Sequence, residues 1–380
     1  MKPALLSPEA YLRAVTLRDL ADPAQGPHAL QLVIDRILTA LQARWGCAVH
    51  VHRAHPAVPV EHNYDRLHYP PDGAARDARY TRYVSETVVL RSQTSAMIPW
   101  LLRRIADHPP ADVLLACPGL VYRRDEIDRL HTGEPHQVDL WRIVDGRIGV
   151  PELREMVAAV MEAVLPGRAY RLNPAEHPYT TDGVEIEVAA DEGWVEVGEC
   201  GLALPAILEE AGLPSARWSG LAMGLGLDRL LMLVKGMDDI RALRSADPRI
   251  AGQMLDLEPY RPVSAQPPVR RDLSVAVDAT RTPEELGDRV REALGERVES
   301  LESVEVLSET PYDALPAAAR ARIGIAPGQK NVLVRVVIRD LVRTLTRAEA
   351  NALRDAVYAS LHEGSAWQWA SDAVPAVAGV

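Results

Sequence analysis

Three observations in the amino-acid sequence predict an α+β protein. Apolar residues recur at helical spacing from Leu30 to Leu41, and the pattern stops at Trp45-Gly46, as expected for an amphipathic helix. Farther along, a glycine-rich strand pattern passes into a helical pattern over Leu227–Lys235. After a proline-rich run, strand and helix patterns resume at Leu273. Strands and helices in both parts of a 380-residue chain indicate an α+β fold with more than one domain.

The clearest boundary is the run Pro259–Pro268, which is stiff and poor in helix or strand character. We therefore expect five parts: an N-terminal helical segment (1–45), a main domain (46–258), a linker (259–267), a C-terminal domain (268–370) and a tail (371–380).

The C-terminal domain has its own order of elements. The patterns predict a strand over 273–277, a helix over 283–294, strands near Val304 and over 332–338, and a final helix over 347–361. This βαββα order fits a small split β-α-β domain.

Composition indicates a soluble protein of the cytoplasm. Hydrophobic residues make up 47% of the chain, enough for sizeable cores, yet no stretch approaches a membrane span and the N-terminus resembles neither a signal nor a transit peptide. Cys47, Cys117 and Cys200 are too few and too scattered for a disulfide framework. A net charge of −11 disfavours general nucleic-acid binding, so any nucleic acid would need a local basic face.

Two short runs look like the halves of an ATP site. In Gly119–Glu126, Arg123 follows a strand and precedes Asp125, and such an arginine can clamp a phosphate bidentately. In Ala222–Arg229, the glycines lead into a helix that places Arg229 near its N-terminus, where anionic phosphates are favoured. Together the runs suggest an enzyme that adenylates a carboxylate.

Other motifs are weaker. Gly224–Arg229 begins like a dinucleotide-binding fingerprint, but its sixth position is arginine and no suitable βαβ unit follows. His50, His52 and His55 could bind zinc, but no further cluster completes a site, and exposed edge-strand histidines explain them better.

The order and spacing of the two ATP-site runs resemble motifs 2 and 3 of class II aminoacyl-tRNA synthetases, and the neighbouring residues resemble the phenylalanyl-tRNA synthetase catalytic (alpha) chain. The C-terminal blocks look like that family's ferredoxin-fold anticodon-binding domain, fused as in the single-chain organellar form. The resemblance implies an antiparallel class II sheet with flanking helices, followed by a ferredoxin-like domain. It rests on these segments: 63–65, 90–95, 122–125, 131–139, 194–201, 220–241, 270–274, 328–330 and 343–346.

For ATP, the resemblance assigns the α-phosphate to Arg123, the γ-phosphate to Arg229 and a second phosphate contact to His131. It makes Glu196 the best candidate ligand for Mg²⁺. The remaining expected ATP contacts are Asp125, Gly224 and Gly226.

For the amino acid, the resemblance places the α-amine and carboxylate at Gln93, Ser95, Gln137 and Asp139, where Gln93 replaces a family histidine. The side-chain pocket would contain His177 and Tyr179, which stand in place of two phenylalanines, together with Ala222 and Glu199. Glu199 replaces a family glycine. Because a buried unpaired carboxylate is costly, we expect it to meet a cation, face solvent or carry a raised pKa.

The chain contains no phenylalanine, although it has seven tryptophans and eleven tyrosines. The family commonly has phenylalanine where this chain has Tyr64, Tyr122, Pro135, Tyr179 and Met223. One explanation is chance or genomic bias. Our alternative hypothesis is a protein that can be made while charged phenylalanine tRNA is scarce, as a backup or resistance enzyme would be.

The resemblance implies ATP-dependent activation of an amino acid, phenylalanine or an analogue, and its transfer to tRNA. The alternative is a paralogue that adenylates another amino acid, for a biosynthetic or non-tRNA acceptor. A non-catalytic regulator is disfavoured because Arg123, His131 and Arg229 are all present. No membrane partner is expected, and the oligomeric state is left open.

Overall fold

The computed structural model describes residues 5–191, 193–264 and 266–367. It divides the chain into two compact units. The first contains Met1–Arg123 and Glu134–Tyr260, and the second contains Arg124–Gly133 and Arg261–Val380. The predicted tail, 371–380, lies outside the described residues.

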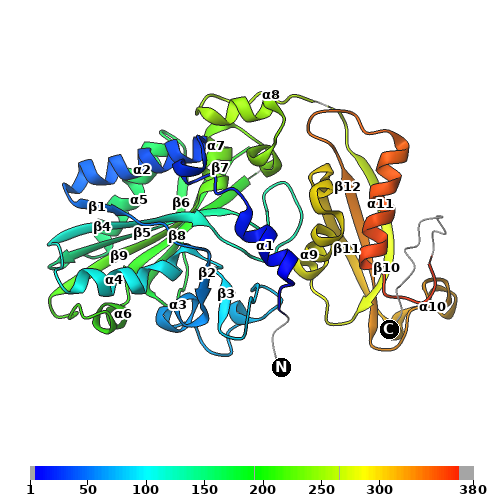
Figure 1. Ribbon diagram of the computed structural model, residues 1–380, viewed down its shortest axis with the longest axis horizontal. Helices are drawn as coiled ribbons and strands as arrows, with labels where there is room; N and C mark the ends of the chain where they lie inside the picture. The colour runs from blue at the N-terminus through cyan, green and yellow to red at the C-terminus, as the bar shows by residue number, and fades with distance from the viewer. Residues whose placement is uncertain (1–4, 192, 265, 368–380) are drawn as a thin grey trace. The chain divides into compact units, whose positions relative to one another are not determined.

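A seven-stranded sheet forms the centre of the first unit, in the order β1-β4-β5-β9-β8-β7-β6 (Figure 1). The pair β1–β4 is parallel and the other pairs are antiparallel, so the α+β class with a mainly antiparallel sheet is confirmed. The strands of this sheet are β1 (Ala48–Val51), β4 (Asp112–Leu120), β5 (His136–Asp145), β6 (Tyr170–Pro174), β7 (Thr180–Ala190), β8 (Gly193–Ala203) and β9 (Trp218–Gly226).

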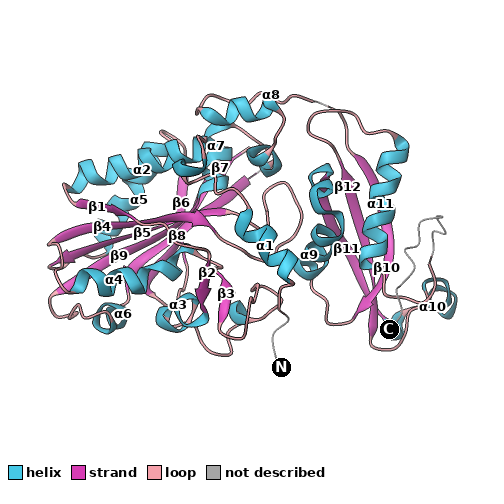
Figure 2. Cartoon of the chain, in the orientation of Figure 1, coloured by secondary structure: helices cyan, strands magenta, loops and turns pink. Residues whose placement is uncertain are grey.

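Helices cover both faces of this sheet (Figure 2). One face carries α2 (Ala29–Trp45), α5 (Val150–Val164) and α7 (Leu227–Lys235), and the other carries α4 (Ile98–Ala106) and α6 (Pro205–Glu210). The remaining elements of the unit are α1 (Pro8–Thr16), α3 (Val60–Asn63), α8 (Pro248–Ala251) and the antiparallel pair β2 (Ala57–Pro59) and β3 (Val88–Leu90).

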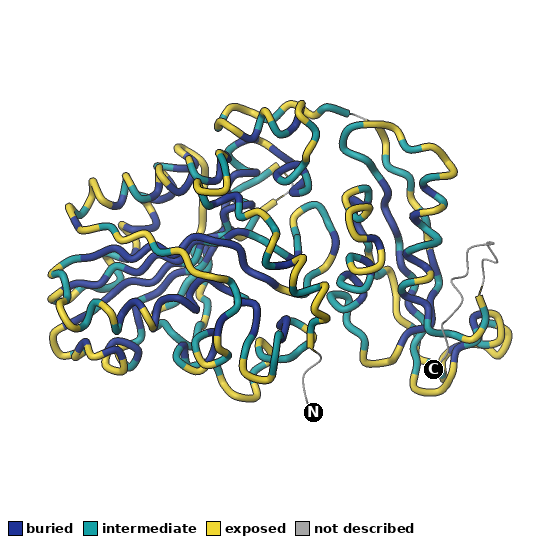
Figure 3. Tube along the Cα trace, in the orientation of Figure 1, coloured by how far each residue is buried: buried dark blue, intermediate teal, exposed yellow. Residues whose placement is uncertain are grey.

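The helix predicted over Leu30–Leu41 is confirmed as α2. It begins after His28, whose Nδ1 accepts a hydrogen bond from the backbone N–H of Leu30 at 3.2 Å. It ends at Gly46, which adopts the left-handed conformation at φ 65°. The apolar side of α2 packs toward the sheet, whose central strands are buried along most of their length (Figure 3).

The face under α4 and α6 holds a continuous apolar core. Alternate residues of a strand point to the same side of a sheet, so Leu115, Trp141 and Ala222 meet side chains of the two helices here. The same face continues along β5 to Asp139 and Gln137, which places the expected amino-acid contacts at the edge of this core.

The second unit contains a three-stranded antiparallel sheet in the order β10-β12-β11. Its strands are β10 (Val269–Asp278), β11 (Leu301–Pro311) and β12 (Gln329–Ile338), and its helices are α9 (Pro283–Leu294), α10 (Ala317–Ile323) and α11 (Arg347–Leu361). Capping boxes at Thr282 and Thr346 start α9 and α11. These elements agree with the sequence patterns except for α10, which was not predicted. The ferredoxin-like assignment stays a prediction.

A loop from the main domain belongs to the second unit. Ile127 pairs with Val304 of β11 through an isolated β-bridge and contributes to the core of that unit. Arg124 Nη1 lies 2.5 Å from Asp288 Oδ2. Arg291 donates from Nη1 and Nη2 to the carbonyl oxygens of residues 125 and 126, each at 2.5 Å. The sequence patterns gave no sign of this arrangement.

Within the described residues, no helix combines the length and the apolar character needed to cross a membrane.

Candidate active site

The two arginines expected to contact phosphate, Arg123 and Arg229, belong to the first unit. Arg123 follows β4, and its Nε donates to the carbonyl oxygen of Ser92 at 2.8 Å. Arg229 is in the first turn of α7, and its Nη1 donates to the carbonyl oxygen of Glu196 at 3.0 Å. Both guanidinium groups are thus oriented by backbone carbonyls, while five N–H donors per guanidinium leave capacity for a phosphate.

Glu196, on β8, is the acidic partner of Arg229, with its Oε2 3.6 Å from Arg229 Nη1. Burial raises the pKa of Glu196, and the nearby Arg229 charge opposes this rise. Among the described residues, no cluster of three or more His, Cys, Asp or Glu side chains is arranged to hold a metal ion. A single carboxylate fits Mg²⁺, which is commonly held by one or two carboxylates together with substrate phosphates.

Asp139 is the buried carboxylate of the expected amino-acid site. Ser95 Oγ donates a hydrogen bond to its Oδ2, and Trp141 Nε1 donates to its Oδ1 at 2.6 Å. Burial raises the pKa of Asp139 from 3.8 to about 6, although both hydrogen bonds favour the charged form. Near neutral pH this carboxylate is therefore an anion in an apolar setting, where an ammonium group would bind favourably.

The polar groups expected beside Asp139 are also in the first unit. Gln93 accepts a hydrogen bond from the hydroxyl of Tyr69 at 2.8 Å and donates from Nε2 to the carbonyl oxygen of Asn63 at 3.1 Å. Gln137 lies two residues before Asp139 on β5, opposite Gly226 of β9. The structure thus brings Gln93, Ser95, Gln137 and Asp139 to one region of the sheet.

Glu199 pairs with a side chain that can carry a positive charge, and it is also partly exposed to solvent. His177 Nε2 lies 2.5 Å from Glu199 Oε2. The hydrogen bond to Glu199 raises the pKa of His177, against the lowering effect of burial. The two departures from the family pattern at these positions therefore form one pair.

Tyr179 and Ala222 lie beside this pair. The ring of Tyr179 is enclosed by the rings of Tyr69, Trp141 and His177. Ala222 lies on β9 directly opposite Trp141. The sequence reasoning did not identify Trp141, because its proximity to the site depends on the register between β5 and β9.

Asp125 and His131 belong to the second unit. His131 Nδ1 lies 2.7 Å from Asp128 Oδ2, and the backbone N–H of His131 donates to Asp128 Oδ1 at 2.8 Å. The first unit alone therefore brings together the expected contacts Arg123, Glu196, Gly224, Gly226 and Arg229, without Asp125 and His131.

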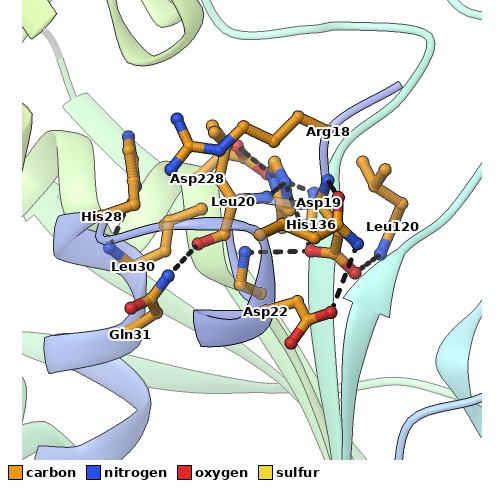
Figure 4. Close-up of polar contacts among 12 residues, drawn as sticks. Arg18, Asp19, Leu20, Asp22, His28, Leu30, Gln31, Leu120, His136 and Asp228 are labelled. Atoms are coloured by element: carbon orange, nitrogen blue, oxygen red, sulfur yellow. Dashed lines mark hydrogen bonds and ion pairs between the residues drawn. The ribbon is translucent and has the colours of Figure 1, made fainter. Parts of the chain in front are cut away.

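A buried His–Asp pair supports two of the site residues (Figure 4). His136 Nδ1 lies 2.9 Å from Asp228 Oδ1, and the backbone N–H of Leu20 donates to His136 Nε2 at 3.1 Å. Since Nε2 accepts, Nδ1 carries the proton and donates to Asp228. Burial alone would raise the pKa of Asp228, but the contacts with His136 lower it overall. His136 precedes Gln137 and Asp228 precedes Arg229, so the pair ties the start of β5 to the first turn of α7.

An antiparallel sheet with one arginine just after a strand and another in the first turn of a helix is the arrangement that the resemblance to motifs 2 and 3 of class II synthetases led us to expect. The comparisons agree: residues 15–254 match the family model described as "tRNA synthetases class II core domain (F)". The chain belongs to this family.

The similar curated proteins carry one name. The chain is 38% identical over 199 residues to the "Phenylalanine--tRNA ligase alpha subunit" of Prochlorococcus marinus (strain MIT 9313), covering 52% of this chain and 58% of that protein. It is 30% identical over 245 residues to the protein of the same name from Nostoc punctiforme, covering 64% of this chain and 72% of that protein. In the two Prochlorococcus relatives the match spans 58% and 56% of their length.

Proposed function

We propose that this chain is an aminoacyl-tRNA ligase of the phenylalanine--tRNA ligase kind, which adenylates an amino acid with ATP and passes it to tRNA. The observation that carries the proposal is the shared location of Arg123, Arg229 and Glu196 with the buried carboxylate of Asp139 in a class II core. Adenylation of an amino acid requires positive charges that bind the phosphates of ATP and a negative charge that binds the ammonium group of the substrate.

In the first step, the substrate carboxylate attacks the α-phosphorus of ATP, and pyrophosphate leaves. This reaction needs positioning and charge neutralisation, with no protein nucleophile. Asp139 and Gln137 hold the α-amino end, Arg123 binds the α-phosphate, and Arg229 binds the γ-phosphate of the leaving group. The resemblance also assigns a further phosphate contact to His131. Glu196 would hold Mg²⁺, which neutralises phosphate charge when bound.

In the second step, a ribose hydroxyl of tRNA attacks the carbonyl carbon of the adenylate, and AMP leaves. We assign tRNA positioning to the second unit, as a ferredoxin-fold anticodon-binding domain on the same chain. The proposal includes a cytoplasmic location and a backup or resistance role connected with the absence of phenylalanine.

Two candidates for the amino acid follow from different observations. The names of the relatives suggest phenylalanine. The His177–Glu199 pair and the enclosed ring of Tyr179 favour a paralogue with a different amino acid. Both candidates share the adenylation step, so that step is tested first.

The test is amino-acid-dependent exchange of pyrophosphate into ATP. We expect Arg123→Ala and Arg229→Ala each to lower exchange by ~10²–10³, since each removes a charge-assisted contact worth ~2–4 kcal/mol in the transition state. Arg171→Ala is the matched control, because Arg171 forms a surface ion pair with Glu187 at 2.5 Å in the same unit. Normal exchange in both site variants, with unfolding curves like the control, would reject the phosphate roles.

A further inference from the structure

The amino-acid site contains a second carboxylate on the same face of the sheet as Asp139. Asp139 lies opposite Gly224 in the β5–β9 register, and Gly224 lies opposite Glu199 in the β9–β8 register. Directly opposed residues of antiparallel strands project to the same side. Two strand spacings separate the Cα atoms of the carboxylates by about 10 Å. Gly224 has no side chain, so the strip of sheet between the carboxylates is open.

Trp141 limits the depth of this site. Its side chain is wholly buried, with 0% exposed, and its Nε1 donates to Asp139. Its ring lies 6.2 Å from the ring of Tyr179, centroid to centroid, with an interplanar angle of 24°. A third ring stacked between them would need a spacing of about 7 Å, because carbon atoms in contact are ~3.5 Å apart. The space between Trp141 and Tyr179 is therefore too narrow for the ring of a substrate.

The other neighbours of Tyr179 also belong to the chain. Tyr69 lies at 6.2 Å and His177 at 5.9 Å, centroid to centroid. The Tyr69 hydroxyl is fixed by its bond to Gln93, and His177 is fixed by its pair with Glu199. Three of the chain's own rings therefore compete with an incoming phenyl ring for contact with Tyr179.

Glu199 keeps hydrogen-bonding capacity on the open strip. Its Oε2 is engaged by His177, while within the described part of the chain no hydrogen bond to its Oε1 is formed. The side chain is 39% exposed, so it is accessible. An ionised carboxyl group can accept about four hydrogen bonds, so Glu199 can bind a donor in addition to His177.

From these contacts we infer that the site takes a small amino acid whose side chain ends in a hydrogen-bond donor, an ammonium or a hydroxyl group. The α-ammonium group binds Asp139, the substrate crosses Gly224, and the side-chain donor binds Glu199. This inference rests on the proposed adenylation activity and specifies its substrate class. Trp141 and Glu199 are the specificity-determining residues. Trp141 excludes a phenyl ring, and Glu199 accepts a hydrogen bond from the side-chain donor of the substrate.

The experiment measures kcat/KM for pyrophosphate exchange by the full chain with side chains of matched size. Norvaline, homoserine and 2,4-diaminobutyrate have the same number of side-chain heavy atoms and end in a methyl, a hydroxyl and an ammonium group. We expect one or both donor-bearing amino acids to exceed norvaline by about 10- to 100-fold, as for one hydrogen bond to a charged group. All three should exceed alanine, and phenylalanine should be a poorer substrate than the best of them.

Two variants connect this ranking to the residues. Glu199→Gln should lower kcat/KM for the donor-bearing side chains by about 10-fold and so remove most of their advantage over norvaline. Trp141→Leu should raise phenylalanine exchange at least tenfold by opening space beside Tyr179. Trp218→Leu is its control, because Trp218 is a buried tryptophan of the same apolar core, far along β9 from the site. If Trp141→Leu does not fold, the ranking of amino acids by kcat/KM in the unmodified chain and in Glu199→Gln still tests the inference.

Phenylalanine as the best substrate of the unmodified chain would overturn the inference and leave the proposed function intact. Equal use of norvaline and both donor-bearing analogues would also overturn it. Exchange with no amino acid at all would reject the proposed function itself, and the inference with it.

Discussion

Burial of the Asp139 carboxylate destabilises the folded chain but favours binding of an ammonium group. The carboxyl group is hydrogen-bonded by Ser95 and Trp141, yet its pKa is raised from 3.8 to about 6 because it is removed from water. The site therefore keeps an anion that destabilises the folded chain near neutral pH. An ammonium group of the substrate would relieve this cost on binding.

Asp139→Asn should therefore stabilise the chain in a pH-dependent way. The folded-state pKa lies above the unfolded value, so between pH 4 and pH 6 the folded state binds more protons, and stability falls as pH rises through this range. Asparagine carries no charge, so the stability of the variant does not fall in this way as pH rises. At pH 8 we expect the variant to be more stable by about 2–3 kcal/mol, with the difference vanishing near pH 4.

Urea denaturation at pH 4 and pH 8 measures this difference, and amino-acid-dependent exchange by the same variant should fall sharply. A variant that is equally destabilised at both pH values would contradict the charged state assigned to Asp139.

At the residue scale, the sequence could predict single side chains but few of their partners. Ser95, Asp139 and Glu199 stand in runs that resemble a known pattern, so their location in one site was predictable. The contact between His136 and Asp228 joins residues 92 positions apart, and Trp141 reaches Tyr179 only through the pairing of strands. Such contacts depend on strand register, which a single sequence does not reveal.

At the scale of elements, the central strands use glycines for two different purposes. A Cβ atom built on Gly198 of β8 would lie 2.2 Å from the carbonyl oxygen of Gly224, which real Cβ contacts do not allow. A Cβ atom built on Gly224 of β9 would meet only Asp139 Oδ2, at 3.8 Å. Gly198 is thus required for close packing of the strands, whereas Gly224 leaves space beside Asp139.

Alanine at the two positions should separate these roles. Gly198→Ala should lower the free energy of unfolding by about 1–3 kcal/mol through overpacking. Gly224→Ala should unfold like the unmodified chain but raise KM for the amino acid several-fold, because its methyl group occupies the strip beside Asp139. Unfolding curves and exchange kinetics for the pair provide the test. Normal amino-acid KM in Gly224→Ala would exclude this strip as the binding surface.

Elements with strong local signals were predicted well from the sequence. The helical periods and their ends predicted α2 and α7. The membership of residues 124–133 in the second unit was missed. This grouping arises from contacts with residues such as Asp288 and Val304, far along the chain, and no local pattern encodes it.

At the scale of the whole molecule, the chain contains no phenylalanine, and two of its tyrosines are buried at positions where the resemblance led us to expect phenylalanine. Tyr64 and Tyr122, at positions where the family commonly has phenylalanine, are almost completely buried. The Tyr64 hydroxyl donates to the carbonyl oxygen of Ala75 at 2.7 Å, and the Tyr122 hydroxyl donates to that of Ala14 at 3.0 Å. Because both buried hydroxyls are hydrogen-bonded, replacing phenylalanine here carries little penalty. The fold therefore accommodates tyrosine at both positions.

The loop 124–133 carries two expected ATP contacts, Asp125 and His131, and is held within the second unit. We therefore expect adenylation to depend on how this loop is held. Arg291 fixes this loop by donating to two consecutive backbone carbonyls, at 2.5 Å each. Loss of this guanidinium would loosen the loop at residues 125 and 126 without removing a residue expected to touch ATP.

Arg291→Ala in the full chain should therefore raise KM for ATP by about tenfold, the effect of roughly one strong hydrogen bond on the loop's bound position, with little change in KM for the amino acid. Arg335→Ala is the matched control, since Arg335 pairs with Asp272 on the exposed side of the same unit at 2.9 Å and does not contact the loop. The two KM values are measured by pyrophosphate exchange, with thermal unfolding to confirm that both variants fold. A selective change in KM for ATP would show that nucleotide binding depends on how the loop 124–133 is held. Unchanged kinetics in Arg291→Ala would mean that adenylation does not depend on how this loop is held, and would leave tRNA positioning as the role of the second unit.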